Sequence, residues 1–336
     1  MAIIKTNDYA VDLNIPDDIN ILFRNINEGD IFDIESYINN LNIDSDGVIV
    51  IWGAVKRINI NDSRLLKLND LYMQIKNPMI LFTGALSWNK PQQLKFNYCP
   101  INIFQYIAKI DLFAIKNGIR SIVLNKSHKF LFMSSKDYLS RCYILQHLIN
   151  QGFSEQGFIS YKCLQSNRNE SYLNDDIKSA CATIDHLLPI QGCDTIWYHS
   201  IPEDYINQAY LSILTETFYE GPTYFSEKIF QAMFHNHFFI YLGPAHSLKY
   251  LKNIGFRTFG HIIDESYDDI EDPVKRLYAV VTSIHNFLSK SIEEIKDLYV
   301  ANLDIINHNK DLLLATEIND FVVNNIKLAI EDKAKQ

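Results

Sequence analysis

The stretch Ser226-Glu227-Lys228 places a hydroxyl, a carboxylate and an ammonium group on three consecutive residues. Apolar residues at helical spacing follow, so the sequence predicts a helix from Glu227 with Ser226 as its N-cap. The first turn of a helix offers free backbone N–H groups and a positive dipole end, which favour an anion. A lysine there is unfavourable for the helix alone but is well placed to bind a ligand phosphate. The neighbouring carboxylate can accept hydrogen bonds from ribose or sugar hydroxyls.

Two further polar or small residues close the predicted strands on either side of this helix. Glu216 follows the apolar run before it, and Gly243 follows the apolar run after it. Ligands of α/β proteins bind beyond the carboxyl ends of parallel strands. A nucleotide sugar carries a pyrophosphate and a ribose and would use both charges of Glu227 and Lys228. The alternative is an ordinary surface pair on an amphipathic helix.

Short apolar runs alternate with helical patterns along the chain, which predicts parallel sheets covered by helices. Strands are predicted at 47–54, 78–86, 120–126, 129–135, 158–163, 209–217 and 238–243. Helices are predicted at 63–75, 101–118, 135–152, 226–237, 247–255 and from 272 onward, with a break near 307–309. Ser135 and Gly152 are the predicted N-cap and C′ residues of the third helix. The length of 336 residues suits two domains of ~150 residues each, with a ligand cleft between them.

The composition, with 47% hydrophobic and 21% charged residues, is that of a globular protein. The five cysteines are an odd number without CxxC or Cys/His ligand spacing, which argues against a disulfide framework and a zinc site. The N-terminus lacks a basic segment followed by an apolar one, and no run approaches the ~20 apolar residues that span a bilayer. We therefore expect a cytoplasmic protein, in the host cytoplasm if its source is viral.

Charge is unevenly distributed along the chain. Residues 1–50 contain 2 basic and 10 acidic residues, residues 51–150 contain 14 basic and 4 acidic ones, and the rest contains 15 basic and 26 acidic ones, which gives −9 in total. The positive block at 51–150 could meet an anionic partner such as nucleic acid, or it could be scattered surface charge.

Several motifs of common catalytic and nucleotide sites do not occur: GxGxxG, GxxxxGK[ST], HExxH and GxSxG. His235 and His237 stand two residues apart in a helical pattern, where they cannot share a face, so no metal site is predicted there. The acidic run from Asp264 to Pro273 lacks EF-hand spacing and is predicted to be a helix N-terminus or a solvated loop.

The segment from Leu211 to Phe259 resembles the donor-binding segment of α1,3-fucosyltransferase-like enzymes with the GT-B fold. That family has a strand ending in an acidic residue, a variable loop, [ST]-E-K at a helix start, and then an apolar helix, a strand and a Gly turn. The matches are Glu216, Ser226-Glu227-Lys228, Ala232 and Leu242-Gly243-Pro244. Upstream, Arg141 matches an arginine at a helix start. The wider pattern, over about residues 129–280, is also similar to uncharacterised glycosyltransferase-like proteins of bacteria and bacteriophages.

The resemblance implies an α/β, GT-B-like protein with two Rossmann-like domains facing a cleft and a helical C-terminus. The predicted domains are an N-terminal acceptor-side domain at 1–122 and a donor-binding domain at 123–305. A C-terminal helical segment at 306–336 could return to the N-terminal domain. The loop before Ser226 departs from the family pattern, so the donor base and the donor sugar stay open.

The resemblance also implies seven donor-binding residues: Arg141, Glu216, Tyr224, Ser226, Glu227, Lys228 and Gly243. Arg141 and Lys228 would hold the pyrophosphate and stabilise its charge as it leaves. Glu227 would bind the ribose, and Glu216 would lie near the donor sugar. Tyr224 would stack on or contact the sugar, and Gly243 would let the backbone approach the nucleotide. Cationic side chains would replace a metal, so the UDP- or GDP-linked sugar is expected as co-substrate with no metal or cofactor.

The residue that deprotonates the acceptor hydroxyl is not located by the sequence. An inverting transferase needs a carboxylate or histidine for this step, and we expect it in the N-terminal domain. The candidates include Glu28, Asp30, Asp33 and Glu35. Acceptor contacts could lie at the strand ends Trp52, Gly53, Thr83 and Gly84, although a tryptophan such as Trp52 is more commonly a core residue.

The function predicted from these residues is transfer of a sugar from a nucleotide-sugar donor to a hydroxyl acceptor, by an inverting and metal-independent reaction. The acceptor could be a carbohydrate or a glycolipid. Two alternatives stay open: a phage-type glycosyltransferase that acts on a modified DNA base, and a non-catalytic nucleotide-binding module. DNA binding would weaken steeply with salt, and binding of a neutral glycan would not.

Overall fold

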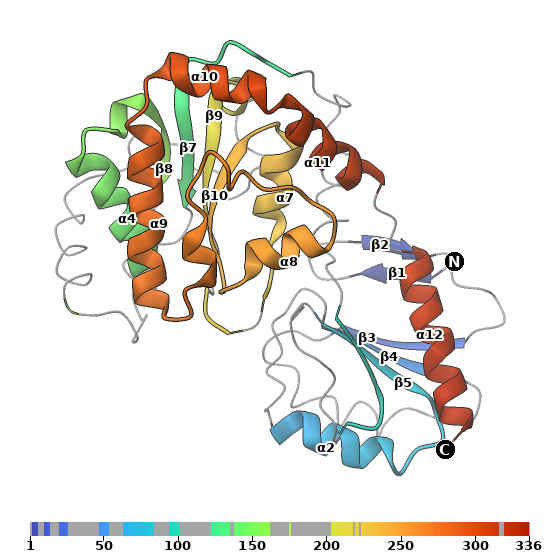
Figure 1. Ribbon diagram of the computed structural model, residues 1–336. Coiled ribbons are helices and arrows are strands. Elements are labelled where there is room, and N and C mark those ends of the chain that lie inside the picture. The colour runs from blue at the N-terminus through green and yellow to red at the C-terminus, as the bar shows by residue number, and fades with distance from the viewer. Residues whose placement is uncertain are drawn as a thin grey trace. The chain divides into compact units, whose positions relative to one another are not determined.

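The computed structural model describes residues 2–5, 10–13, 20–25, 47–53, 63–83, 94–100, 122–134, 138–161, 175, 203–217, 219–221, 223–315 and 319–335. The contacts divide the chain into two compact units, and Figure 1 labels many of their helices and strands. Unit 1 comprises Met1–Ile107, Pro222–Tyr224 and Thr316–Gln336. Unit 2 comprises Ala108–Gly221 and Phe225–Ala315.

Unit 1 contains a parallel sheet in the order β3–β4–β5–β6. Its elements are β3 (Asn20–Asn25), β4 (Gly47–Gly53), α2 (Ser63–Tyr72), β5 (Met79–Thr83), β6 (Asn97–Pro100) and α12 (Asn319–Ala334). β1 (Ala2–Lys5) and β2 (Ala10–Leu13) form a separate antiparallel pair.

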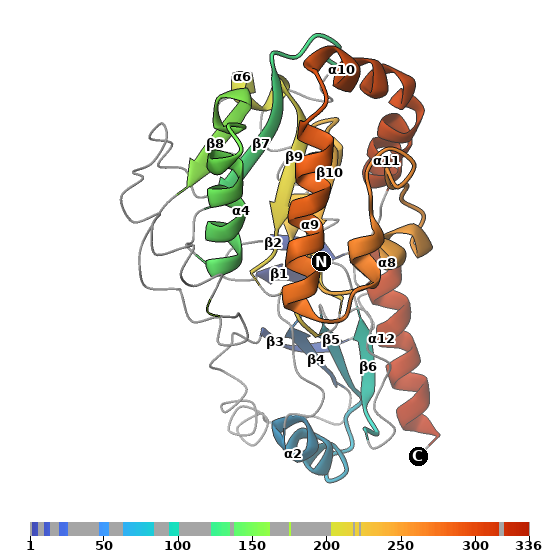
Figure 2. The same ribbon diagram turned by 60° about the vertical axis from the view of Figure 1, so that its left-hand side comes forward.

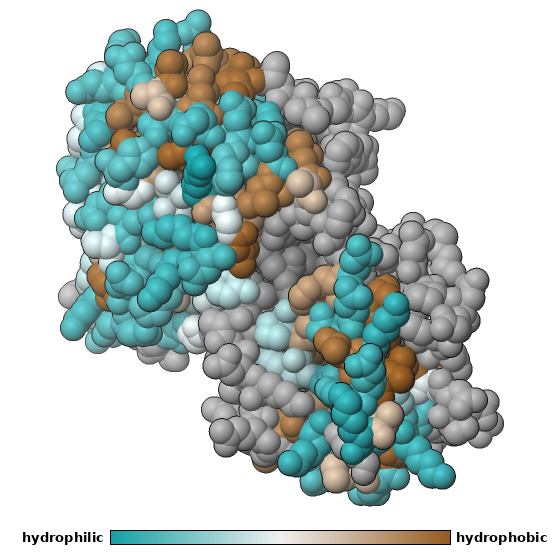
Figure 3. Space-filling model, turned by 45° about the vertical axis from the view of Figure 1, so that its right-hand side comes forward, coloured by the Kyte–Doolittle hydropathy of each residue, from teal (hydrophilic) through white to brown (hydrophobic). Residues whose placement is uncertain are grey.

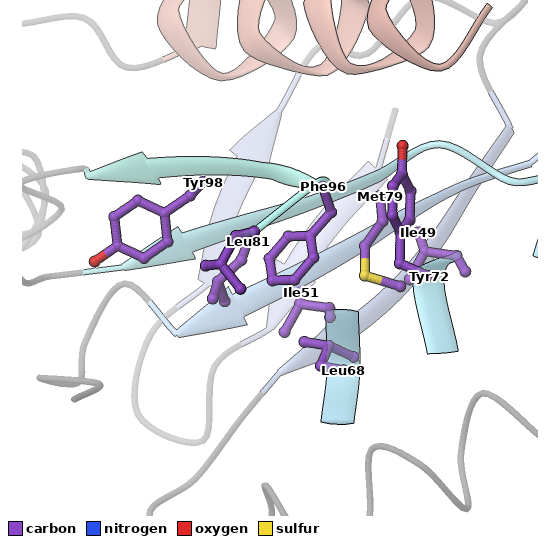
Figure 4. Packing of buried hydrophobic residues seen from close by; sticks show 9 residues of the cluster. Ile49, Ile51, Leu68, Tyr72, Met79, Leu81, Phe96 and Tyr98 are labelled. Atoms are coloured by element: carbon purple, nitrogen blue, oxygen red, sulfur yellow. The ribbon is translucent and has the colours of Figure 1, made fainter. Parts of the chain in front are cut away.

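The core of unit 1 uses both faces of this sheet. Alternate residues of a strand point to opposite faces. One face of β4 and β5 packs against α2 in a cluster that contains Ile49, Ile51, Leu68, Tyr72, Met79, Leu81, Leu94, Phe96 and Tyr98. Figure 4 shows these side chains on one side of the strands and the pale red ribbon of α12 on the other. α12 contacts β4 and β5 and buries Val322, Val323, Ile326 and Ala329.

Unit 2 contains a second parallel sheet, in the order β10–β9–β7–β8. The strands are β7 (His128–Ser134), β8 (Gly157–Tyr161), β9 (Ala209–Thr215) and β10 (Phe238–Leu242). β9 and β10 are buried at every position. Continuous apolar runs are typical of parallel strands that are covered on both faces, and these two runs are such strands.

The helical elements of unit 2 are α4 (Leu139–Asn150), η2 (Ser154–Gln156), α6 (Glu203–Asn207), α7 (Glu227–Phe234), α8 (Ser247–Asn253), η5 (Ser266–Asp269), α9 (Pro273–Leu288), α10 (Ile292–Ala301) and α11 (Leu303–Ala315). α7 packs against β9 and β10, and α11 packs against α7. α9 packs against β10, and α4 lies beside α9 (Figure 2). Hydrophilic residues cover much of the described surface in the view of Figure 3, with smaller hydrophobic patches among them.

The α/β class and the helical C-terminus predicted from the sequence are confirmed by these elements. Local signals explain several boundaries. Gly152 follows α4 with a φ of 70°, as a C′ glycine does. Asp272 caps α9 by accepting from the backbone N–H groups of Val274 and Lys275, both at 2.9 Å. The acidic run that contains Asp272 therefore includes the predicted helix N-terminus.

Two local predictions are wrong. The predicted strand at 120–126 does not form over its described residues, 122–126. There the backbone N–H of Lys126 donates to the Tyr210 hydroxyl at 3.1 Å, and that hydroxyl donates to the Leu124 carbonyl at 2.9 Å. A side chain thus takes the place of a neighbouring strand. The N-cap of α4 is Tyr138 and not Ser135.

The predicted helix break near 307–309 is also wrong, because α11 runs unbroken through it. Asn309 lies in the middle of α11 but is only 1% exposed. Its side-chain amide accepts from the Arg257 N–H and donates to the Arg257 carbonyl, both at 2.8 Å. A tertiary contact therefore explains this asparagine. The long helix predicted from 272 onward is instead interrupted after α9, at Ser289–Ser291. There Ser291 and Glu294 form a capping box for α10.

Candidate functional site

The candidate site lies at the carboxyl ends of β9 and β10 in unit 2. β9 ends at Thr215 and β10 at Leu242, and the two strands are parallel neighbours. The Glu216 N–H donates to the Leu242 carbonyl at 2.9 Å, which extends the pairing by one residue. α7 begins after Ser226 and packs against both strands. The strand ends and the first turn of a helix therefore meet at one place, where α/β proteins bind ligands.

Glu216 is the centre of the hydrogen bonds at this site. Its side chain is only 2% exposed. Its Oε1 atom accepts from the Ser226 N–H at 3.0 Å, from the Ser226 hydroxyl at 2.7 Å and from the Tyr241 hydroxyl at 3.0 Å. A buried carboxylate needs such donors, because an unpaired buried charge is costly. These bonds connect the end of β9 to the start of α7 and to β10.

Ser226 occupies the predicted N-cap position of α7, but its side chain does not cap the helix. The hydroxyl donates to Glu216 and accepts from the Lys228 ammonium at 2.9 Å. The prediction of the helix start is confirmed, and the predicted use of the serine side chain is wrong. The hydroxyl points to the buried Glu216 carboxylate, and the Lys228 ammonium donates to it in place of a backbone N–H group.

Lys228 lies between two carboxylates in the first turn of α7. Its Nζ is 3.6 Å from Glu216 Oε2 and 3.7 Å from Glu227 Oε1. The Lys228 side chain is 26% exposed and that of Glu227 is 15% exposed. These ion pairs offset the unfavourable dipole that a lysine meets at a helix N-terminus. An ammonium has three donors, so Lys228 keeps donors for a ligand beside its bond to Ser226.

Gly243 has a structural explanation that involves Tyr241. A Cβ atom at position 243 would lie 2.1 Å from Cε1 of the Tyr241 ring. Glycine at 243 thus lets the ring lie close to the backbone there, while its hydroxyl reaches Glu216. Sequence reasoning missed Tyr241, which looks like any apolar residue of β10. The spacing Tyr-x-Gly is the signal that could have found it.

Replacing Gly243 with alanine is expected to lower the free energy of unfolding by about 1–3 kcal/mol, because the Tyr241 ring must move. Denaturant unfolding measures this change. Replacing Tyr241 with alanine removes the clash, so in that background the second substitution should cost much less. Equal costs in both backgrounds would show that the ring does not constrain position 243.

Arg141 is the third residue of α4 and is 3% exposed. Its guanidinium donates to the Thr215 carbonyl at 3.2 Å, to the Thr217 hydroxyl at 3.4 Å and to the Ser134 hydroxyl at 3.3 Å. It also lies over the Tyr138 ring, with 5.0 Å from Cζ to the ring centroid. The predicted position at a helix start is confirmed. The side chain holds the residues on both sides of Glu216, and its contact with a diphosphate stays a prediction.

The remaining predicted residues belong to unit 1 or lie outside the described residues. Tyr224 is half-buried and belongs to unit 1. Trp52 and Gly53 end β4, and Thr83 ends β5, in unit 1. Gly84 and the candidate bases Glu28, Asp30, Asp33 and Glu35 lie outside the described residues. The predicted helix at 101–118 lies outside them as well.

The residues His235, Asn236 and His237 follow α7 and do not lie within it, because α7 ends at Phe234. His237 is 1% exposed, and its Nδ1 and Nε2 atoms lie 2.8 Å from the Ser212 hydroxyl and from the Ile206 carbonyl oxygen. Both ring nitrogens thus have protein partners. Asn236 adopts a left-handed conformation with a φ of 59°, which turns the chain into β10.

The positive block at 51–150 is partly internal. Lys126 is 6% exposed and Arg141 is 3% exposed, and both are held by hydrogen bonds inside unit 2. These two charges do not contribute to a surface patch. Among the described residues, no helix is long and apolar enough to cross a membrane.

The fold and this site define an α/β protein with a charged cluster at the carboxyl edge of a parallel sheet. The sequence matches no protein-family model and no curated protein sequence. Among solved structures, the chain is similar to an α1,3-fucosyltransferase with a TM-score of 0.39 and 9% sequence identity, over 98% of this chain and 94% of that chain. A TM-score this low defines neither the family nor the activity of this chain.

Proposed function

We propose that this protein is a glycosyltransferase that takes a sugar from a nucleotide-sugar donor bound at the carboxyl edge of the unit 2 sheet. The observation that carries the proposal is the position of Lys228. It lies in the first turn of α7, partly exposed, and is held by Ser226 and Glu216. Backbone N–H groups and a lysine at a helix N-terminus are a suitable site for a diphosphate. The resemblance of Ser226-Glu227-Lys228 and its flanks to fucosyltransferase-like enzymes agrees with this assignment.

In the proposed reaction, Lys228 donates to the donor diphosphate and stabilises the negative charge that develops as the sugar leaves. Glu227 is partly exposed beside it and accepts from the ribose hydroxyls. Glu216 acts through its partners, because its buried carboxylate fixes Ser226 and Lys228. Arg141 adds a positive charge behind the end of β9. A base of unit 1 would deprotonate the acceptor hydroxyl in an inverting step.

The charges of the site set a condition on the ligand. Glu216 and Glu227 are two acidic side chains, and Lys228 and Arg141 are two basic ones, so their formal charges sum to zero. The dipole of α7 then favours an anion. A diphosphate that also offers hydroxyls to Glu227 fits this mixture better than an inorganic anion does. Nucleoside diphosphates should therefore bind more tightly than pyrophosphate.

A thermal-shift and calorimetric screen tests this function. UDP, GDP and their sugar conjugates are added to the purified protein, with inorganic pyrophosphate and the corresponding nucleosides as comparison ligands. At 100 times its Kd, a true ligand should add about 2.7 kcal/mol to the free energy of unfolding. The proposal fails if none of the nucleoside diphosphates or nucleotide sugars stabilises the protein. Hydrolysis of the bound nucleotide sugar then separates an enzyme from a binding module.

A further inference from the structure

A second buried arginine, Arg276, lies in the first part of α9 and is 2% exposed. Its guanidinium donates to three backbone carbonyls, those of Tyr219, Ile270 and Glu271. The guanidinium carbon also lies 5.9 Å from the centroid of the Tyr219 ring. Tyr219, which is fully buried, belongs to the connection between β9 and α7. Arg276 therefore joins this connection to the segment that precedes α9.

Among the residues that the structure describes, no carboxylate forms an ion pair with the guanidinium, but Glu271, Asp268 and Glu220 lie close enough to favour its charge. Burying a charge is expensive unless hydrogen bonds offset the loss of water. Three carbonyls in a fixed arrangement do so here, and the planar fork of arginine suits them. A lysine side chain has a single nitrogen, so it cannot reach the Tyr219 carbonyl and the carbonyls of Ile270 and Glu271 in the same way. The identity of the residue, and not only its charge, should therefore matter.

The connection from β9 to α7 is held at three places by side chains from different elements. Arg141 of α4 binds Thr215 and Thr217. Arg276 of α9 binds Tyr219. Glu216 binds Ser226 at the other end. Lys228 donates to that same Ser226, so its position depends on how the connection lies.

We infer that Arg276 is a positioning residue of the candidate site: by fixing Tyr219 against α9, it holds the β9–α7 connection in the conformation that presents Ser226 and Lys228 to the diphosphate. The inference rests on the proposed function for its consequence on ligand binding. The structural part of the inference, that Arg276 orders the β9–α7 connection, does not depend on the proposed function. Sequence reasoning missed this arginine, since it lies in the apolar pattern of a surface helix.

The test uses Arg276→Lys and Arg276→Met in the full chain, with Ser283→Ala as the matched control. Ser283 lies on the same helix, and its hydroxyl donates to the carbonyl of Asp264 at 2.8 Å. Asp264 does not belong to the β9–α7 connection. Amide hydrogen exchange is followed over residues 219–228 without ligand. GDP and UDP affinities are then measured by calorimetry at a temperature where every variant is folded.

We expect faster exchange over 219–228 in both Arg276 variants and not in Ser283→Ala. The nucleoside diphosphate affinity should fall about tenfold, because the site must be ordered on binding. Unchanged exchange overturns the inference, whatever the affinity does. Faster exchange with unchanged affinity overturns the positioning role and leaves the proposed function standing. If the wild-type protein binds no nucleotide, the proposed function and the positioning role fail together, and the exchange result alone decides whether Arg276 orders the connection.

Discussion

Replacing Lys228 with alanine is expected to weaken the binding of a nucleoside diphosphate by roughly 10- to 100-fold, the loss of one charged hydrogen bond. In the proposed reaction, sugar transfer should fall further, by roughly 100- to 1,000-fold, because the charge on the diphosphate would grow as the sugar leaves. The fold should persist. Glu216 keeps its three hydrogen bonds to Ser226 and Tyr241, and a partly exposed ion pair contributes about 1 kcal/mol or less to stability.

Calorimetry with GDP and UDP and single-turnover kinetics measure the two effects separately. Lys275→Ala is the matched control, because Lys275 is an exposed lysine in the first turn of another helix of unit 2, α9. Lys228→Arg keeps the charge and should restore part of the affinity. If Lys228→Ala and Lys275→Ala bind and turn over the donor alike, the diphosphate does not bind at the start of α7.

The parts of the fold that the sequence predicts are those with strong local patterns. The apolar runs of β9 and β10 and the helical periodicity of α9 are local, and each matches its predicted element closely. β3 and β6 were not predicted, because a short strand with polar residues has no clear alternation. They are the two edge strands of the unit 1 sheet, and their pairing with β4 and β5, which no local window contains, makes them strands.

The site shows the same difference between features set by local sequence and features set by tertiary packing. The start of α7 at Glu227 follows from local spacing, and so does the presence of charge there. The partners of those charges do not. Tyr241 reaches Glu216 from 25 residues away in the sequence, and Arg141 reaches Thr215 from 74 residues away. Such pairs are set by how strands and helices pack, so a single sequence indicates which residues carry chemistry but not which of them meet.

The buried Lys126 is expected to make the free energy of unfolding depend on pH. Its ammonium lies inside unit 2, where it donates to the carbonyls of Ala209 at 2.9 Å and Asn236 at 3.3 Å. The rings of Tyr299 and Tyr210 lie 4.6 and 5.6 Å from Nζ. Burial lowers the pKa of Lys126 to about 7. An unfolded lysine has a pKa of about 10.4.

Between these two pKa values, the unfolded chain binds one proton more than the folded protein at this position. Stability should therefore rise with pH from about 7 upward, by as much as about 1.4 kcal/mol per pH unit. Below pH 7 both states hold the proton, so the contribution no longer changes. Lys310 donates to the Asn236 side chain at 2.9 Å, and burial lowers its pKa too, which adds a slope of the same sign.

Lys126→Met keeps most of the apolar stem and removes the titrating group. Denaturant unfolding at several pH values between 6 and 9.5 should show a shallower rise for this variant than for the wild type. Lys249→Met, at an exposed position of α8, is the control and should follow the wild-type slope. Burial raises the pKa of Cys99 in unit 1 to about 12, which makes stability fall at the alkaline end. That effect is common to all three proteins and cancels in their differences.

Parallel pH profiles for the wild type and Lys126→Met would contradict the prediction and would have a definite physical meaning. The two carbonyls and the two tyrosine rings would then stabilise the ammonium enough to keep it charged in the folded protein. In that case the positive charge joins the turn at Asn236 to the start of β9. Lys126→Met should then lower stability by a similar amount at every pH. The slope thus separates a buried neutral amine from a buried cation held by carbonyls and aromatic rings.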